Sequence, residues 1–192
     1  MRDMSATQRR AMTIDEFLRW EEAQELRWEF DGFEPVAMTG GTVGHSMIQR
    51  NVITALTNRL RGGPCQVFTS DLKIQTPHSI RYPDVFVSCT PVPRGATVVT
   101  EPVVVFEVLS ASTATTDHLV KNQEYRDTRS IQRYVMLAQD RPGGTVFGRT
   151  GGEWIGRVLD ADAVLDMPEI GISVPVAEFY EGMVFGEEAA GG

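Results

Sequence analysis

The chain has 192 residues, of which 42% are hydrophobic and 23% are charged, a composition typical of one globular domain rather than of a disordered, collagen-like or coiled-coil chain. With a net charge of −8, the chain lacks the overall positive field of a protein that binds nucleic acid independently of sequence. No stretch approaches the ~20 apolar residues of a membrane-spanning helix, and the N-terminal residues lack the apolar core of a secretory signal. We therefore expect a cytoplasmic protein with no membrane partner.

The first elements are a helix and a hairpin. Thr13-Ile14-Asp15-Glu16 has the pattern of a capping box and predicts a helix over 14–25. The pair Asp31-Gly32 predicts a tight turn between strands over 27–30 and 33–38. The apolar face of the helix is expected to consist of Phe17, Leu18, Ala23 and Leu26.

A second helix follows a glycine-rich loop over 39–42. Apolar residues keep a helical period from Val43 until Gly62-Gly63-Pro64 stops it. Because the loop lacks the lysine of a phosphate-binding loop, we interpret it as a connector. The segments that come next are short and rich in Val, Ile and Phe, which predicts strands over 65–70, 72–76, 82–88 and 103–109.

The run Val103-Val104-Val105-Phe106 is apolar at every position, which is typical of a central strand covered on both faces. A third helix is expected over 116–128, capped by Thr115 or Thr116. Its packing groups are expected to be Leu119, Val120, Tyr125 and Tyr134. Further strands are predicted over 133–137, 145–149 and 154–158, with a short closing element over 176–180. The pattern predicts one α/β domain over 13–185, between flexible ends at 1–12 and 186–192.

Cys65 and Cys89 are the only cysteines. Neither belongs to a Cys-x-x-Cys pair, and neither lies near a histidine at the spacing of zinc ligands, so a disulfide and a zinc site are both weakly indicated. We expect two small core side chains. The histidines, His45, His78 and His118, are too scattered to form a metal cluster by spacing, so surface or capping roles are expected for them.

Two acids interrupt otherwise apolar strands. Asp84 follows Pro83 and precedes Val85-Phe86-Val87, where it is either a strand-end residue or a functional acid. Glu107 lies within the most apolar strand, where a charge needs a partner, a proton or a metal ion. An edge position or an ion pair with an arginine would also account for Glu107. If the two carboxylates lie close together, an oxygen-only pair of this kind suits Mg²⁺ or Mn²⁺.

Lys121 is unusual because the chain has only two lysines beside 16 arginines. It lies on the helix after the Glu107 strand, where an ammonium can orient or help to deprotonate a water molecule. A surface ion pair with Asp117, four residues earlier, is the simpler interpretation.

Together these residues resemble a known family. Pro83-Asp84, a gap of 22 residues and then Glu107-Val108-Leu109-Ser110 look like the PD-(D/E)XK nuclease superfamily. A narrower resemblance, to the Uma-type restriction endonucleases of bacteria, covers the chain from Met12 to Phe185. It is carried by Phe30-Asp31-Gly32, His45 at the start of a helix, Tyr82 to Val87, Val105 to Ser110, Asp117 with Lys121, and Tyr134-Val135.

The resemblance implies a restriction-endonuclease-like α/β/α core with a central mixed sheet, an N-terminal helix and hairpin, and extra C-terminal strands. It also implies that Asp84, Glu107 and the Val108 carbonyl hold the Mg²⁺ or Mn²⁺ ion. The superfamily's lysine lies two residues after the acid, where this chain has Leu109, so Lys121 would reach the site from the following helix. Other residues that would line the site, by analogy, are Glu29, Glu34, His45 and Asp71.

The leading hypothesis is therefore a metal-dependent endonuclease that hydrolyses DNA, with Asp84 and Glu107 binding the metal and Lys121 orienting water. The alternative is a catalytically inactive nuclease-like module that binds nucleic acid or a protein. A homodimer would suit a double-strand cut, although no interface is specified. The acidity lies mainly at the end of the chain, because residues 31–150 hold 12 basic and 10 acidic groups. Expected phosphate contacts, unless they are solvated surface residues, are Arg126, Arg129 and Arg133.

Overall fold

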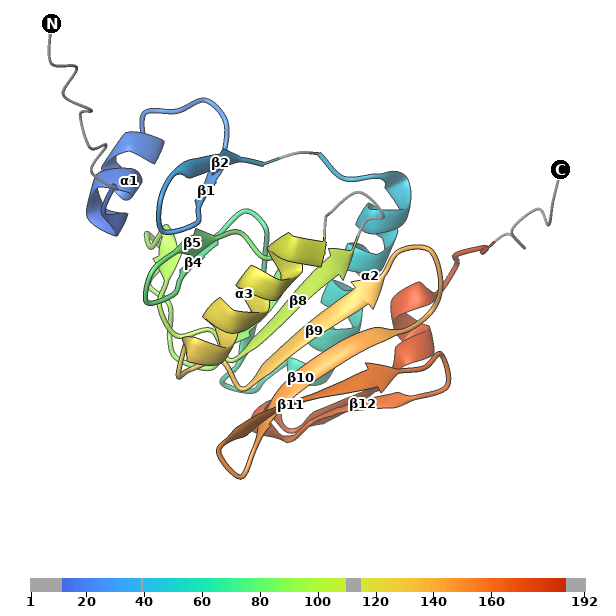
Figure 1. Cartoon of the computed structure of the whole chain (residues 1–192). Helices are drawn as coiled ribbons and strands as arrows, with labels where there is room; N and C mark the ends of the chain where they lie inside the picture. Colours follow the sequence, from blue (N-terminus) through green and yellow to red (C-terminus); the bar gives the residue numbers. More distant parts are fainter. Residues whose placement is uncertain (1–11, 39, 110–114, 186–192) are drawn as a thin grey trace, which may run out of the picture.

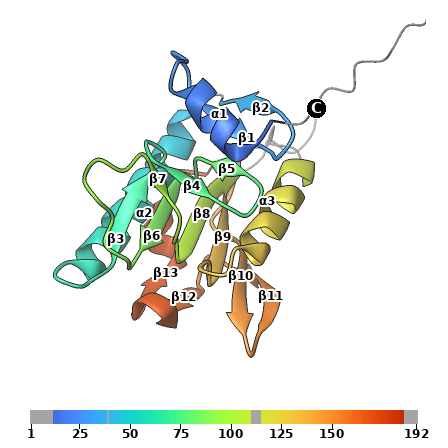
Figure 2. The same cartoon turned by 90° about the vertical axis from the view of Figure 1, so that its left-hand side faces the viewer.

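The computed structural model describes residues 12–38, 40–109 and 115–185 of the chain. The described part is a mixed α/β structure built on a six-stranded sheet, with strand order β11-β10-β9-β8-β6-β3. A five-stranded sheet of order β2-β1-β5-β4-β7 and a two-stranded β12-β13 sheet accompany it. Figures 1 and 2 show α3 on one side of the large sheet and α2 on the other.

The large sheet has a parallel centre and antiparallel flanks. Its two central strands, β8 and β9, run parallel and are joined through α3, and the remaining pairs are antiparallel. The predicted central position of the 103–109 strand is confirmed, because β8 lies between β6 and β9 and is buried from Val104 to Val108. The strands of this sheet are β3 (Gln66–Thr69), β6 (Val85–Ser88), β8 (Val104–Leu109), β9 (Arg133–Ala138), β10 (Gly144–Thr150) and β11 (Glu153–Leu159).

The two faces of β8 bury different cores. Val104, Phe106 and Val108 pack with α2 (Val43–Leu60) and with the C-terminal elements. Val105 packs instead in a second core that includes Tyr125 of α3 (Thr115–Asp127) and Ile74 of the smaller sheet. Because side chains alternate along a strand, Glu107 lies on the Val105 face, beneath α3. This topology is the restriction-endonuclease-like α/β/α core that the resemblance implies.

The N-terminal elements follow the prediction with shorter bounds. The capping box forms, since Glu16 N–H donates to Thr13 Oγ1 and the Glu16 carboxylate accepts from Thr13 N–H. The helix α1 (Ile14–Glu21) ends four residues before the predicted limit, as the chain tightens into a turn in which the Gln24 side chain donates to the Trp20 carbonyl. Leu26 consequently lies outside the helix and is exposed, so its predicted place on the apolar face is wrong.

The smaller sheet includes two strands that the sequence did not indicate, β5 and β7. Its hairpin has a four-residue loop rather than a tight turn, with Gly32 at a φ of 94° and Asp31 Oδ1 accepting from two backbone N–H groups. The strands of this sheet are β1 (Trp28–Phe30), β2 (Pro35–Ala37), β4 (Lys73–Gln75), β5 (Ile80–Arg81) and β7 (Val98–Val99).

The predicted helix α2 is confirmed, and Gly62 at a φ of 80° follows it as expected for a helix stop. At the other end of the chain, the predicted closing element is the 3-10 helix η2 (Val176–Tyr180). The remaining C-terminal elements, which the periodicity did not predict, are β12 (Val164–Met167), η1 (Pro168–Ile170) and β13 (Ile172–Pro175).

The cysteine prediction is wrong, because Cys65 and Cys89 form a disulfide with a Cα–Cα distance of 3.8 Å. In the antiparallel β3–β6 pair, Gln66 faces Ser88. One step further along the same register, Cys65 faces Cys89, so the pairing follows from strand register rather than from sequence spacing. Both side chains still pack partly against the main core.

The third helix also differs from the prediction in the side chains it buries. Tyr125 and Tyr134 are fully buried as expected, whereas Leu119 is 65% and Val120 43% exposed. The face of α3 turned to the sheet carries Lys121 and Tyr125, so the buried face of this helix is partly polar. The side chains of Thr115 and Thr116, one of which is the predicted cap, are outside the described part of the structure. The predicted flexible ends are also outside it, apart from Met12. Among the described residues, no helix has the length and hydrophobicity to cross a membrane.

Candidate active site

The ends of β6 and β8 place two acids opposite each other. Val85 pairs with Phe106 in the antiparallel register, and one step further Asp84 faces Glu107. Facing residues of an antiparallel pair point to the same side of the sheet, with Cβ atoms about 5 Å apart. The Val108 N–H donates a hydrogen bond of 2.7 Å to Asp84 Oδ2, which extends the contact between the two strands beyond their backbone pairing.

Glu107 is buried in the face of the sheet beneath α3. Its Oε1 lies 3.4 Å from Lys121 Nζ and accepts a hydrogen bond of 3.1 Å from the Tyr125 hydroxyl. Burial raises the pKa of Glu107 to about 8; the Lys121 ammonium opposes this rise, and the carboxylates of Asp84 and Glu29 add to it. The partner of this buried acid is therefore a lysine, and neither an edge position nor an arginine pair accounts for it.

Asp84 is held by groups from two other elements. Burial raises its pKa, whereas the Val108 N–H and the nearby His45 lower it. His45 Nε2, from the first turn of α2, lies 2.9 Å from Asp84 Oδ1. This nitrogen is buried and, among the described residues, has no hydrogen-bond partner, so the 2.9 Å contact lacks the alignment of a hydrogen bond. The structure thus places His45 beside Asp84, and its part in a site stays a prediction.

Lys121 reaches the acids from α3. Its side chain is only 9% exposed, and Nζ lies 3.4 Å from Glu107 Oε1 and 3.5 Å from Glu29 Oε1. A side chain in this position is not the surface lysine of the simpler interpretation, although the side chain of Asp117 lies outside the description. The helix thus supplies a cation beside the acids. The strand position at which the resemblance leads one to expect a lysine is occupied by Leu109.

Glu29 completes the group of acids. Its Oε2 accepts from Arg81 Nη1 at 3.1 Å, and its Oε1 accepts from the Tyr82 N–H at 3.0 Å. Arg81 also binds both carboxylate oxygens of Glu124. Burial alone would lower the pKa of Arg81, but the carboxylates of Glu124 and Glu29 raise it above its ordinary value.

Sequence reasoning missed Arg81, Glu124 and Tyr125 as parts of this group. Arg81 lies on β5, a strand that the residue pattern does not indicate, and Glu124 and Tyr125 lie on a helix whose inward face was expected to be apolar. The available signal was helical spacing. Lys121, Glu124, Tyr125 and Thr128 recur at intervals of three and four residues, which places them on one face of α3.

Two of the expected site-lining residues lie outside this group. Glu34 is exposed in the hairpin loop. Asp71 has a side chain that is 76% exposed and pairs with Arg27 at 2.5 Å. Within the described part of the chain, neither side chain takes part in the contacts of Asp84 and Glu107 described above.

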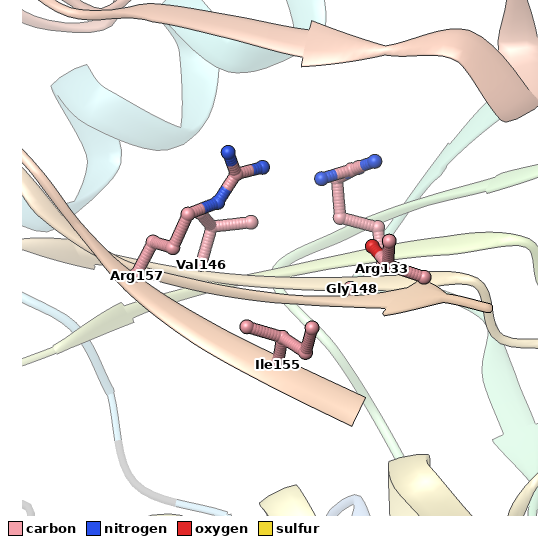
Figure 3. A pocket seen from close by; sticks show the side chains of 6 residues that line it. Arg133, Val146, Gly148, Ile155 and Arg157 are labelled. Carbon is pink, nitrogen blue, oxygen red and sulfur yellow. The ribbon is translucent and has the colours of Figure 1, made fainter. Parts of the chain in front are cut away.

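Of the three arginines expected to contact phosphate, Arg133 does not fit. Its side chain is 8% exposed and binds Glu169 through Nε at 2.5 Å and Nη2 at 3.0 Å. It lines a pocket with Val146, Gly148, Thr150, Ile155 and Arg157, shown in Figure 3. Arg133 lies on the same face of β9 as Val135, opposite the face that carries Glu107, so it is directed away from the acids. Arg126 and Arg129 are exposed, and their contact with phosphate stays a prediction.

The acids offer a donor set that suits a hard divalent cation. Asp84 and Glu107 present carboxylate oxygens at facing positions, and burial disfavours two uncompensated charges there. Among the described residues, no group of three or more His, Cys, Asp or Glu side chains is arranged to hold a metal ion. Two carboxylates, completed by a backbone carbonyl and water, nevertheless match the way Mg²⁺ is usually bound.

Comparison with known proteins identifies the family. The model of Uma2, described as "Putative restriction endonuclease", matches residues 14–177. The chain belongs to the Uma2 family. A crystal structure described as a "putative nuclease belonging to DUF820" from Anabaena variabilis has the same fold, with a TM-score of 0.73. It is 18% identical in sequence, and the match covers 88% of this chain and 97% of that one.

Two Synechocystis proteins are similar in sequence to this Uma2 chain. "Uncharacterized protein slr1290" is 34% identical over 178 residues, which cover 91% of this chain and 94% of the relative. "Uncharacterized protein sll1609" is 29% identical over 133 residues, which cover 67% of this chain and 75% of the relative. The Uma2 match spans the elements that carry Glu29, Asp84, Glu107 and Lys121, so the whole group lies within the family region.

Proposed function

We propose that this Uma2 protein is a metal-dependent endonuclease that hydrolyses phosphodiester bonds of DNA. The observation that carries the proposal is the facing position of Asp84 and Glu107, with the Lys121 ammonium 3.4 Å from Glu107. The family description and the nuclease-like fold favour a nucleic-acid substrate. Two identical sites related by two-fold symmetry could each cut one strand of a DNA duplex. We therefore propose a homodimer as the form that makes double-strand breaks.

In this proposal Asp84, Glu107 and the carbonyl of Val108 hold Mg²⁺ or Mn²⁺. Such an ion, when bound, supplies charge stabilisation for the phosphate oxygens and lowers the pKa of a coordinated water. Lys121 orients the attacking water from the side of α3, and the Glu29 carboxylate lies 3.5 Å from its ammonium. Tyr125 fixes the Glu107 carboxylate through its hydroxyl hydrogen bond.

Cleavage of supercoiled plasmid tests the proposal. We expect the wild-type protein to nick or linearise the plasmid with Mg²⁺ or Mn²⁺ and to leave it intact with EDTA. Asp84→Asn and Glu107→Gln preserve the size of each side chain and should each lower the rate at least about 100-fold. Asp71→Asn, at an exposed acid paired with Arg27, is the matched control and should cleave like the wild type.

Full activity in Asp84→Asn and Glu107→Gln would show that the acids are not the metal ligands. If the wild type instead binds DNA without cutting it under any of these conditions, the protein is the inactive binding module, and the proposed activity is wrong.

A further inference from the structure

The cation of the candidate site is carried by a helix, and a helix can shift against a sheet more easily than a strand can shift within one. Lys121 depends for its position on how α3 packs against β8 and on the acids around its ammonium. The helix face that meets the sheet carries Lys121, Glu124 and Tyr125, at intervals of three and four residues. Polar contacts on this face therefore determine where the ammonium lies.

Arg81 forms a bidentate contact with this face of α3. Its side chain is 2% exposed and lies on β5 of the smaller sheet. Nε and Nη2 donate to the two oxygens of Glu124, each at 2.8 Å, which is the bidentate geometry of a strong arginine–carboxylate pair. Glu124 lies three residues after Lys121, so this pair fixes the stretch of α3 that carries the lysine.

The same guanidinium also fixes Glu29 on β1. Phe30 pairs with Ile80, and one step further Glu29 faces Arg81 across the two strands. Nη1 donates to Glu29 Oε2 at 3.1 Å, while Glu29 Oε1 accepts from the Tyr82 N–H and lies 3.5 Å from Lys121 Nζ. Arg81 is therefore in contact with the helix that carries Lys121 and with one of the acids beside its ammonium.

We propose that Arg81 is the positioning residue for Lys121, acting through Glu124 and Glu29. This inference rests on the proposed nuclease function, because Lys121 is the group it serves. A lysine at position 81 would keep the charge, but a single ammonium cannot form the planar fork to Glu124 and reach Glu29 as well. Without the fork, the charge of Glu29 is less compensated and draws the Lys121 ammonium away from Glu107.

The lysine content of the chain makes this inference directly measurable, because Lys73 and Lys121 are its only lysines. In protein labelled with ¹³C-lysine and kept in EDTA, NMR should give one ε-methylene signal set for each. Lys121→Met assigns them. Lys73 serves as an internal reference, since its buried ammonium pairs with Glu21 and lies over the Tyr82 ring, and neither Arg81 nor Glu29 is its ion-pair partner among the described contacts.

We expect Arg81→Lys and Glu29→Gln to shift the Lys121 signals and to merge the separate resonances of its two ε protons, while the Lys73 signals stay in place. Arg59→Lys is the matched control, because Arg59 forms a similar fork with Glu178 between α2 and η2. It should leave both signal sets unchanged. In cleavage assays Arg81→Lys should lower kcat about 10- to 100-fold with little change in KM for DNA.

Unchanged Lys121 signals in Arg81→Lys would overturn the inference. Equal changes of the Lys73 and Lys121 signals would also overturn it, because Arg81 would then only support the fold. The NMR result does not depend on catalysis. A wild-type protein with an immobilised Lys121 but no cleavage of DNA would contradict the proposed function and leave the positioning by Arg81 intact.

Discussion

The carboxylate of Asp84 accepts a 2.7 Å hydrogen bond from the backbone N–H of Val108, the residue that follows Glu107. This bond joins the first residue before β6 to the end of β8, and it holds one acid of the candidate site against the backbone that carries the other. The acid pair is thus held by this bond together with the pairing of β6 and β8.

Replacing Asp84 by alanine should therefore affect the fold as well as the chemistry. The Val108 N–H would lose its acceptor, which costs about 1 to 3 kcal/mol for a buried donor. Relief of the buried charge should offset part of this loss in metal-free protein. Urea unfolding at pH 5 and pH 8 measures both contributions. We expect Asp84→Ala to be the less stable protein at pH 5, and equal stability at pH 5 would contradict the structural role of this bond.

The raised pKa of Glu107 predicts that the metal-free protein loses stability as pH rises. The native pKa of about 8 lies above the ordinary value of 4.5. The native state thus holds this proton more tightly than the unfolded state does, and the resulting stability is complete below pH 4.5 and is lost as pH rises to about 8. Thermal unfolding in EDTA from pH 5 to pH 9 should show a falling Tm for the wild type.

Glu107→Gln keeps the shape of the neutral side chain and cannot ionise. We expect its Tm to fall less across the same pH range and to exceed that of the wild type at pH 9 by about 5 °C or more. Parallel curves for the two proteins would show that Glu107 does not titrate in this range.

The disulfide predicts a dependence of stability on reducing agent. It joins positions 24 residues apart, and the entropy of closing such a loop corresponds to about 3 kcal/mol. Cys65→Ser/Cys89→Ser should be less stable by this order in urea unfolding, and dithiothreitol should lower the wild type to the same level. If protein purified and denatured without reductant shows two free thiols, the disulfide is absent.

The three arginines expected to contact phosphate, Arg126, Arg129 and Arg133, should separate into two kinds. Arg133→Ala leaves the largely buried carboxylate of Glu169 without its partner and should destabilise the fold by about 3 kcal/mol. Arg126→Ala and Arg129→Ala remove exposed cations and should change stability little. If these two arginines contact phosphate, each substitution weakens binding to DNA of every sequence. It also lowers the slope of log binding constant against log salt concentration by about 1. Unaltered salt dependence would leave them as surface residues.

Much of the fold could be predicted because local patterns and tertiary packing agree. The capping box of α1, the apolar period of α2 and the apolar run of β8 each formed the expected element. The two-residue strands β5 and β7 could not be predicted, because they are too short to show a period and exist through pairing with β4. The disulfide escaped prediction for a similar reason, since only the β3–β6 register brings Cys65 to Cys89.

The candidate site was predictable where a residue was out of place in its segment. Asp84 and Glu107 interrupt apolar strands, and Lys121 is rare in a chain of arginines. Arg81 and Glu124 gave no such signal, because charged residues are common in short strands and on helices. Arg133 shows the opposite error: its charge suggested a surface role, while Glu169, 36 residues away in the sequence, permits its burial.

Calorimetric titration with Mn²⁺ tests the central claim, that Asp84 and Glu107 together hold a divalent cation. At pH 8 we expect the wild type and the Asp71→Asn control to bind Mn²⁺ with the same affinity. Asp84→Asn and Glu107→Gln should each weaken that binding by at least about 100-fold. Equal Mn²⁺ binding by all four proteins, or no binding by the wild type, would contradict the account.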